Sequence, residues 1–186
     1  MNVTLRTPLM TREQFLDWVE RQETPFEFDG YEPVPMTGGT LRHALLCSNI
    51  LFALRKRLDG ADFDVLSEAG VATVGDAVRY PDVMIIPSGG CLQDRIMPSP
   101  LVVFEVVSPT SGRTDRHLKL RECRAVPTIR RYIIVDGDGL TVYSRAAGGQ
   151  DWVADALGTE EAVSVPEVGI EIPVKELFLR VGADPV

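Results

Sequence analysis

The chain has 186 residues, of which 45% are hydrophobic and 25% charged, and its net charge at pH 7 is -8. This length and apolar content predict one globular domain, residues 1–186, with a closed core. The sequence has no apolar run of membrane-spanning length, and residues 1–10 lack the features of a signal peptide. We therefore expect a cytoplasmic protein without a membrane partner. The negative net charge disfavours a protein that coats nucleic acid over its whole surface.

Helical patterns begin near the amino terminus. Thr11 and Gln14 form a capping-box pattern that predicts a short helix after Thr11. A longer helix is predicted from Thr40 to about Leu58, because leucines recur there at helical spacing and Gly60 can end it.

The remaining elements are predicted mostly as strands. A hairpin is expected around Asp29-Gly30, and a helix runs to Ala125 from a start near Ser111 or Thr114. Further strands are predicted near 63–66, 70–74, 78–86, 101–107, 131–136, 140–144, 152–157, 162–165 and 170–174. Together they predict an α/β (α+β) fold, with a mixed central sheet flanked by helices and additional hairpins toward both ends.

Two apolar runs, residues 83–86 and 101–104, lack the polar alternation of a half-exposed strand. They are typical of central strands in a sheet covered on both faces. Asp82 precedes the first run and Glu105 follows the second, and a charge beside such a strand is costly without a cation or a catalytic role. Carboxylates at adjacent strand ends can hold Mg²⁺, a hard cation that prefers oxygen ligands. The pattern therefore predicts an acidic site at the rim of the core.

The helix that follows Glu105 carries Lys119, with Asp115 four residues earlier on the same face. One interpretation is an ordinary surface pair between Asp115 and Lys119, worth a few tenths of a kcal/mol. The other is an ammonium that orients an attacking water or stabilises phosphate charge beside a metal. Spacing alone leaves both interpretations open.

The same region reverses the sign of the charge. Between residues 113 and 131 there are seven basic and two acidic residues, a local net charge of +5. A solvated helix face and a phosphate-facing surface are about equally supported.

The three cysteines do not form a recognisable metal or disulfide pattern. Cys47, Cys91 and Cys123 are odd in number and widely separated, so we expect free thiols. Zinc is disfavoured further because the chain has only two histidines, His43 and His117.

The motifs occur in a recognisable order: Tyr-Pro-Asp-Val at 80–83, Glu-Val-Val-Ser-Pro-Thr at 105–110, Asp115 with Lys119, and Pro-Thr-Ile-Arg-Arg-Tyr at 127–132. This order resembles the Uma-two family of restriction endonuclease-like proteins, within the PD-(D/E)XK nuclease superfamily. Matching positions at 26–30, His43, Asn49 and 163–178 extend the resemblance over nearly the whole chain.

The resemblance implies a restriction endonuclease-like fold and a metal-dependent nuclease. Asp82 and Glu105 would be metal ligands together with the backbone carbonyl of Val106, and Lys119 would be the catalytic lysine. Val107 stands where most of the superfamily has that lysine, and this family places it on the following helix. The cation would be Mg²⁺, with Mn²⁺ as a substitute.

Two further positions match the family. Glu27 could complete the metal shell or be an ordinary hairpin carboxylate, and His43 is expected to make a structural hydrogen bond. The implied substrate is nucleic acid, with DNA favoured over RNA. A homodimer is expected from the two-fold symmetry of duplex DNA. The alternatives are a catalytically silent module that binds nucleic acid or protein, and a structural homo-oligomerisation module.

Overall fold

The computed structural model describes residues 7–182 apart from 37, 61, 108–112 and 147–150, and only the backbone of 113–116. Its helices are α1 (Arg12–Val19), α2 (Leu41–Leu58), α3 (Arg113–Ala125) and α4 (Val174–Leu177), with a 3₁₀ turn at Val74–Asp76. Its strands are β1 (Phe26–Phe28), β2 (Pro33–Pro35), β3 (Phe63–Ser67), β4 (Val71–Ala72), β5 (Val78–Arg79), β6 (Val83–Pro87), β7 (Val102–Val106), β8 (Arg131–Asp136), β9 (Gly139–Arg145), β10 (Trp152–Leu157), β11 (Ala162–Val165) and β12 (Ile170–Pro173).

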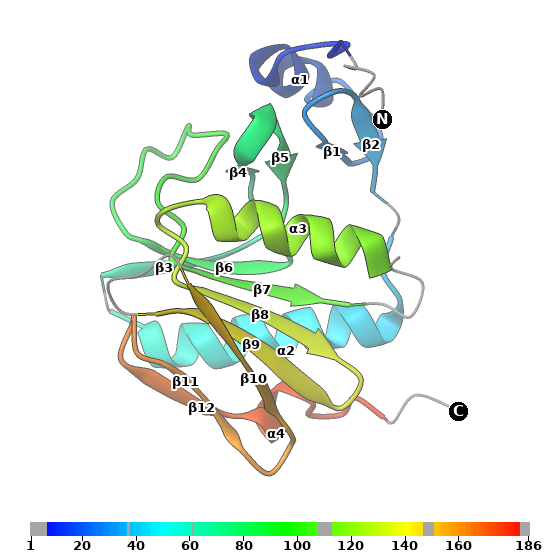
Figure 1. Ribbon diagram of the computed structural model, residues 1–186. Helices are drawn as coiled ribbons and strands as arrows, with labels where there is room; N and C mark the ends of the chain where they lie inside the picture. Colours follow the sequence, from blue (N-terminus) through cyan, green and yellow to red (C-terminus); the bar gives the residue numbers. More distant parts are fainter. Residues whose placement is uncertain (1–6, 37, 61, 108–112, 147–150, 183–186) are drawn as a thin grey trace.

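A six-stranded mixed sheet forms the centre of the molecule, in the order β10-β9-β8-β7-β6-β3. The β7–β8 pair is parallel, and α3 is the crossover that joins these two strands. Helix α3 lies on one face of the sheet and α2 on the other (Figure 1). The predicted mixed sheet flanked by helices is confirmed.

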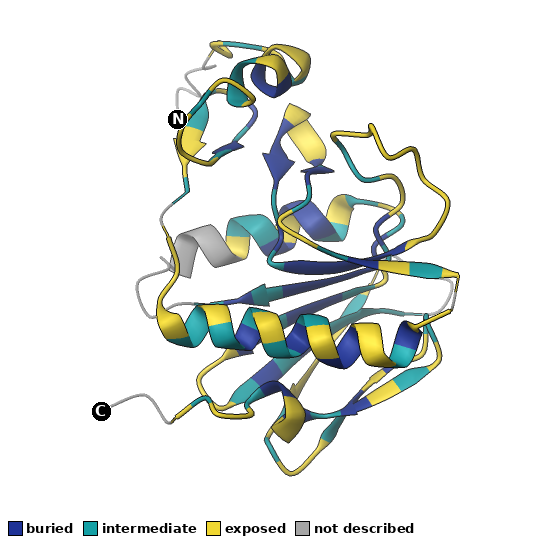
Figure 2. Cartoon of the chain, turned by 180° about the vertical axis from the view of Figure 1, so that it is seen from behind, coloured by how far each residue is buried: buried dark blue, intermediate teal, exposed yellow. Residues whose placement is uncertain are grey.

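Both faces of this sheet are buried, which explains the two continuous apolar runs. On one face, α2 contributes Leu46, Ile50 and Leu54 to a core with Val83 and Phe104. On the other face, side chains from the sheet and from α3 form a second core that includes Met84, Val103, Leu120, Cys123 and Tyr132. Figure 2 shows the buried strands between the two helices and the exposed outer side of α2.

A smaller sheet, in the order β2-β1-β5-β4, lies beside the central sheet and carries α1 (Figure 1). The predicted capping box is present, since the Thr11 and Gln14 side chains each bond the other's backbone N–H. Phe15 of α1 stacks on Phe28 of β1 with ring centroids 5.1 Å apart. These two rings, with Leu16 and Val78, form a separate small core.

The predicted single strand over 78–86 is wrong. Its first part is β5 in the small sheet, and its second part is β6 in the central sheet. Pro81 stands between them, and proline has no N–H to donate to a strand ladder. The chain therefore passes from one sheet to the other at residues 80–82, which places Asp82 at their junction.

The hairpins expected toward both ends are present as β1–β2 and β11–β12. The first connects through an Asx turn, in which an Asp29 side-chain oxygen accepts from the N–H groups of Tyr31 and Glu32. Gly30 follows at φ +90°, and a Cβ there would collide with the Gly75 carbonyl. Within the described residues, none of the helices could cross a bilayer, since all are too short or too polar.

Candidate functional site

Asp82 is fixed against strand β7 by a backbone hydrogen bond. The Val106 N–H donates to Asp82 Oδ2 at 2.6 Å. Val83 pairs with Phe104 in the antiparallel ladder, so Asp82 and Glu105 occupy the next position along the two strands. The two strand ends that carry these carboxylates are therefore side by side, as predicted.

Glu105 and Lys119 form an ion pair between β7 and α3. The Lys119 ammonium donates to Glu105 Oε1 at 3.3 Å, and both side chains are 18% exposed. Phe104 and Val106 point into the α2-side core, so alternation along the strand turns Glu105 toward α3. Lys119 thus reaches the acidic site, as the functional interpretation requires. The Asp115 side chain, its partner in the other interpretation, lies outside the described residues.

Glu27 supplies a second contact to Lys119, from the small sheet. Its Oε1 accepts from the Lys119 ammonium at 3.1 Å and from the Tyr80 N–H at 3.4 Å. Its Oε2 accepts from Arg79 at 3.2 Å. Because both oxygens already accept hydrogen bonds from protein groups, this carboxylate holds the lysine in place.

Arg79 and Glu122 extend this chain of charges into the interior. Arg79 donates to both Glu122 oxygens, at 2.7 and 3.0 Å, and both residues are buried. Burial opposes the charged guanidinium, but the hydrogen bonds and charge of Glu122, followed by those of Glu27, raise the pKa of Arg79. Neither Arg79 nor Glu122 was predicted from the sequence to have a role. The available signal was an arginine next to an otherwise apolar strand.

The surroundings of the Glu105 carboxyl disfavour its charged form. Burial is the largest cause that raises its pKa to about 7, and the negative charges of Asp82 and Glu27 add to it. Lys119 lowers the pKa but only in part. A further cation beside Glu105 would favour its ionised form, so the site has the charge balance that a metal ion would satisfy.

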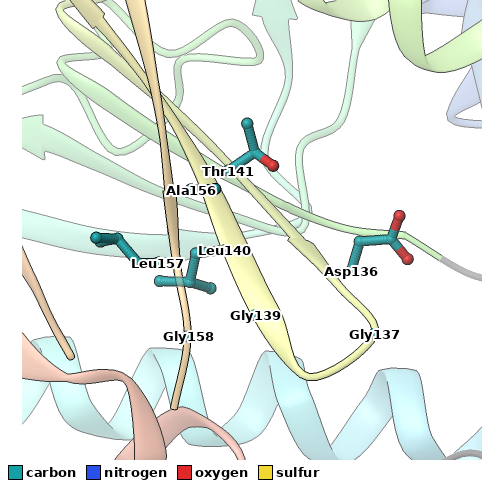
Figure 3. A pocket seen from close by; sticks show the side chains of 8 residues that line it. All are labelled: Asp136, Gly137, Gly139, Leu140, Thr141, Ala156, Leu157 and Gly158. Carbon is teal, nitrogen blue, oxygen red and sulfur yellow. The ribbon is translucent and has the colours of Figure 1, made fainter. Parts of the chain in front are cut away.

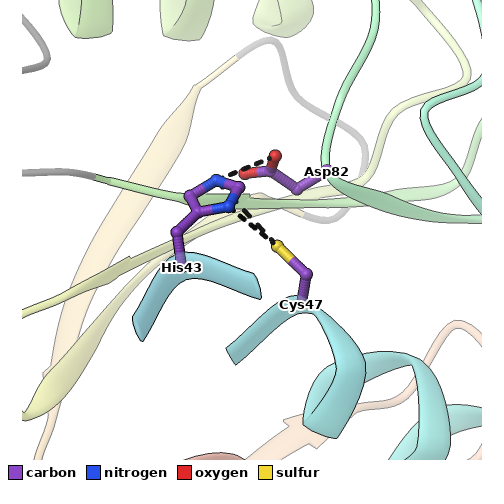
Figure 4. Close-up of side chains that lie close together, drawn as sticks. All are labelled: His43, Cys47 and Asp82. Atoms are coloured by element: carbon purple, nitrogen blue, oxygen red, sulfur yellow. Dashed lines mark hydrogen bonds and ion pairs between the residues drawn. The ribbon is translucent and has the colours of Figure 1, made fainter. Parts of the chain in front are cut away.

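On the α2 side, Asp82 meets a histidine and a cysteine. Figure 4 shows His43 and Cys47 of α2 and Asp82 pointing toward one another. His43 Nε2 lies 3.2 Å from Asp82 Oδ1, and His43 Nδ1 lies 3.6 Å from Cys47 Sγ. The hydrogen bond to Asp82 raises the pKa of His43 to about 10, and burial raises the pKa of the Cys47 thiol. The predicted hydrogen bond of His43 is thus to Asp82.

These three side chains could hold a metal ion, because their ligand atoms all lie within 4.8 Å of one another. All three cysteines are free thiols, as predicted. The group was not predicted from the sequence, although His43 and Cys47 have the i, i+4 spacing of neighbours on one helix face.

The carboxylate oxygens of Asp82 and Glu105, beside β7, suit a harder cation than the imidazole and thiol of His43 and Cys47 do. The Asp82 and Glu105 side chains are 19% and 18% exposed, so neither is completely enclosed. Carboxylate and carbonyl oxygens are the ligands that Mg²⁺ prefers. The donor chemistry of these two residues is therefore the kind that the predicted magnesium site requires.

A surface hollow has none of these residues in its lining. It is lined by Asp136, Gly137, Gly139, Leu140, Thr141, Ala156, Leu157 and Gly158, around the β8–β9 turn and β10 (Figure 3). Among the described residues that line it, Asp136 alone is ionisable. This composition offers no constellation for catalysis, so the acidic site is the better candidate.

Comparisons with known proteins agree with the fold described above. The Uma2 family model, described as "Putative restriction endonuclease", matches residues 12–175. Uncharacterized proteins slr1290 and sll1609 of Synechocystis are each 23% identical to the chain; the alignments cover 92% and 87% of it and 92% and 95% of theirs. A crystal structure of a "putative nuclease belonging to DUF820" from Anabaena variabilis shares the fold, with a TM-score of 0.73 at 16% identity over 91% of this chain and 98% of that one.

Proposed function

Because the chain belongs to the Uma2 family, we propose that it is a Mg²⁺-dependent nuclease that hydrolyses phosphodiester bonds in DNA. The observation that carries the proposal is the contact of Lys119 with Glu105, on the strand that also anchors Asp82. An acidic pair with a neighbouring ammonium is a minimal set for phosphodiester hydrolysis.

Asp82, Glu105 and the carbonyl of Val106 would hold the cation. Bound there, Mg²⁺ or Mn²⁺ would polarise the scissile phosphate and lower the pKa of a coordinated water. The Val106 N–H keeps the Asp82 carboxylate in one orientation, through a bond of 2.6 Å. This anchoring reduces the reorganisation needed when substrate arrives.

Lys119 would position the attacking water or neutralise charge in the transition state. Glu27 holds its ammonium 3.1 Å away, and Arg79 in turn holds Glu27. We assign Glu27 this positioning role in preference to metal ligation, since its carboxylate is buried and is already paired with two cations, Arg79 and Lys119.

We further propose a cytoplasmic homodimer acting on duplex DNA. A single-site domain that cuts both strands needs two active sites related by the two-fold symmetry of the duplex. DNA rather than RNA is proposed from the restriction endonuclease description of the family.

The test compares wild type with Asp82→Asn, Glu105→Gln and Lys119→Ala on supercoiled plasmid, linear duplex, single strands and RNA. Reactions contain Mg²⁺ or Mn²⁺ at low salt, where electrostatic binding is strongest. The matched controls are Asp64→Asn and Lys56→Ala, which change exposed residues of the same types. Loss of cleavage in the three site variants, but not in the controls, supports the proposal. Metal binding by wild type without cleavage of any substrate would favour the silent binding module.

A further inference from the structure

The group formed by His43, Cys47 and Asp82 offers one nitrogen, one sulfur and one oxygen ligand. The metal site proposed above uses oxygen alone, and the nuclease chemistry gives the thiol no task. Sulfur and imidazole are ligands of zinc-class cations, whereas Mg²⁺ does not select a thiolate. The group therefore differs in kind from the acidic site with which it shares Asp82.

Two of its three ligand spacings are close to those of tetrahedral coordination. Zinc–ligand bonds of about 2.0–2.3 Å place neighbouring ligand atoms roughly 3.3–3.8 Å apart. His43 Nε2 lies 3.2 Å from Asp82 Oδ1 and 3.9 Å from Cys47 Sγ. Cys47 Sγ and the Asp82 oxygen lie within 4.8 Å of each other, so side-chain rotation would complete the geometry, and water would occupy the fourth position. His43 and Cys47 would release their protons to solvent as the ion binds.

The backbone holds these ligands in place before any ion arrives. His43 and Cys47 lie one turn apart on α2, whose first turn is capped by Thr40 through the His43 N–H. Asp82 Oδ2 is engaged by the Val106 N–H, which leaves Oδ1 facing the imidazole. Such secondary hydrogen bonds orient metal ligands and strengthen binding. All three residues are partly exposed, so an ion has access.

We propose that His43, Cys47 and Asp82 bind Zn²⁺ or a similar thiophilic cation, and that this binding inhibits the nuclease by withdrawing Asp82 from the magnesium site. The inhibitory part rests on the proposed function, whereas the binding part does not. Two effects disfavour Mg²⁺ once zinc is bound. Asp82 Oδ1 is already coordinated, and a second divalent charge lies close to the Glu105 carboxylate.

Binding is tested by titrating the metal-free full chain with Co²⁺, a spectroscopic substitute for zinc. Thiolate ligation gives an intense near-ultraviolet charge-transfer band and tetrahedral geometry gives visible bands. We expect these bands in wild type and in Cys91→Ser, which removes the exposed thiol. They should be absent in Cys47→Ser and weakened in His43→Gln. Zinc affinity of Cys47→Ser should fall by at least about 10–100-fold, the loss seen even for outer-shell partners.

Competition is then measured by electron paramagnetic resonance of Mn²⁺, without reference to cleavage. One equivalent of Zn²⁺ should weaken Mn²⁺ binding at least tenfold in wild type and in Cys91→Ser, but not in Cys47→Ser. With substrate, inhibition by Zn²⁺ is expressed relative to each variant's own rate with Mg²⁺ alone. The site is refuted if Co²⁺ gives no thiolate band, or if the band survives Cys47→Ser. A wild type that shows the band and the competition yet cleaves nothing would refute the nuclease but not the zinc site.

Discussion

Arg79 and Glu122 form a two-bonded ion pair in the interior, between strand β5 of the small sheet and helix α3. Only 5% of the Arg79 side chain and 7% of the Glu122 side chain are exposed. Arg79 also bonds Glu27, and Glu27 bonds Lys119. The ion pair is therefore the inner end of a network that terminates at Glu105.

Breaking this buried pair should be strongly destabilising. Arg79→Ala would leave the buried Glu122 carboxylate without the guanidinium that bonds both its oxygens, and would remove one of the cations that Glu27 contacts. We expect the free energy of unfolding to fall by about 3–5 kcal/mol, the usual effect of removing one partner of a buried ion pair. Urea denaturation measures it.

Arg95→Ala is the matched control, because Arg95 pairs with Asp17 and Glu20 at the surface. Exposed pairs contribute about 0–1 kcal/mol. Equal effects of the two substitutions would contradict the assigned importance of the buried pair.

Substitutions of Lys119 distinguish a role in turnover from a role in metal binding. Lys119→Ala should lower turnover by roughly 10²-fold or more, the scale of one lost transition-state contact. Its Mg²⁺ affinity, measured by calorimetry, should be no weaker than that of wild type, because a cation next to Glu105 is removed. Lys119→Arg should restore little activity, since a planar guanidinium does not replace a compact ammonium. Wild-type turnover in Lys119→Ala would exclude the lysine from the mechanism.

The Glu105 carboxyl makes stability depend on pH. Its pKa is about 7 in the folded protein against 4.5 ordinarily. Between these pH values the folded state therefore keeps a proton that the unfolded state releases. The contribution of this proton to the free energy of unfolding is fully present below pH 4.5 and is lost as pH rises through 7. Relative to wild type, Glu105→Gln should become progressively more stable between these pH values and change little above them.

Urea denaturation at a series of pH values measures this difference, with the exposed Glu171→Gln as control. Mg²⁺ should also raise the melting temperature of wild type more at pH 8 than at pH 5, because it binds the ionised carboxylate. A constant difference between wild type and Glu105→Gln across this range would contradict the raised pKa.

The small core of the amino-terminal sheet gives a further prediction. Phe28 is fully buried against Phe15, so Phe28→Ala should lower the free energy of unfolding by about 3–5 kcal/mol. It should also reduce nuclease activity, because β1 carries both Phe28 and Glu27. Phe52→Ala, which truncates an exposed phenylalanine of α2, is the control and should change neither quantity by much. A Phe28→Ala protein with wild-type stability would show that this core contributes little.

Much of this arrangement could be predicted because it depends on local pattern. The apolar runs identify β6 and β7, and their flanking carboxylates identify Asp82 and Glu105. Lys119 could be proposed because it lies on the helix predicted after Glu105 and matches the lysine position of the family that the sequence resembles.

The remaining contacts depend on tertiary packing, which a single sequence does not reveal. Arg79 and Glu122 are 43 residues apart and meet only because α3 lies over the junction of two sheets. The junction itself was missed, since the 78–86 run reads as one strand unless Pro81 is taken as a break. The approach of Asp82 to Cys47 and His43 follows from that same junction.

The participation of Glu27 has a consequence for how heat inactivates the protein. Glu27 belongs to the sheet whose own core consists of Phe15, Leu16, Phe28 and Val78, while the other groups of the site rest on the much larger central core. Small cooperative units of this kind open by themselves before the whole molecule unfolds. Such an opening would release Lys119 from the Glu27 carboxylate while the six-stranded sheet stays intact. Amide hydrogen exchange in β1 and β5, rather than the global melting curve, would then report the temperature at which the contact between Glu27 and Lys119 is lost.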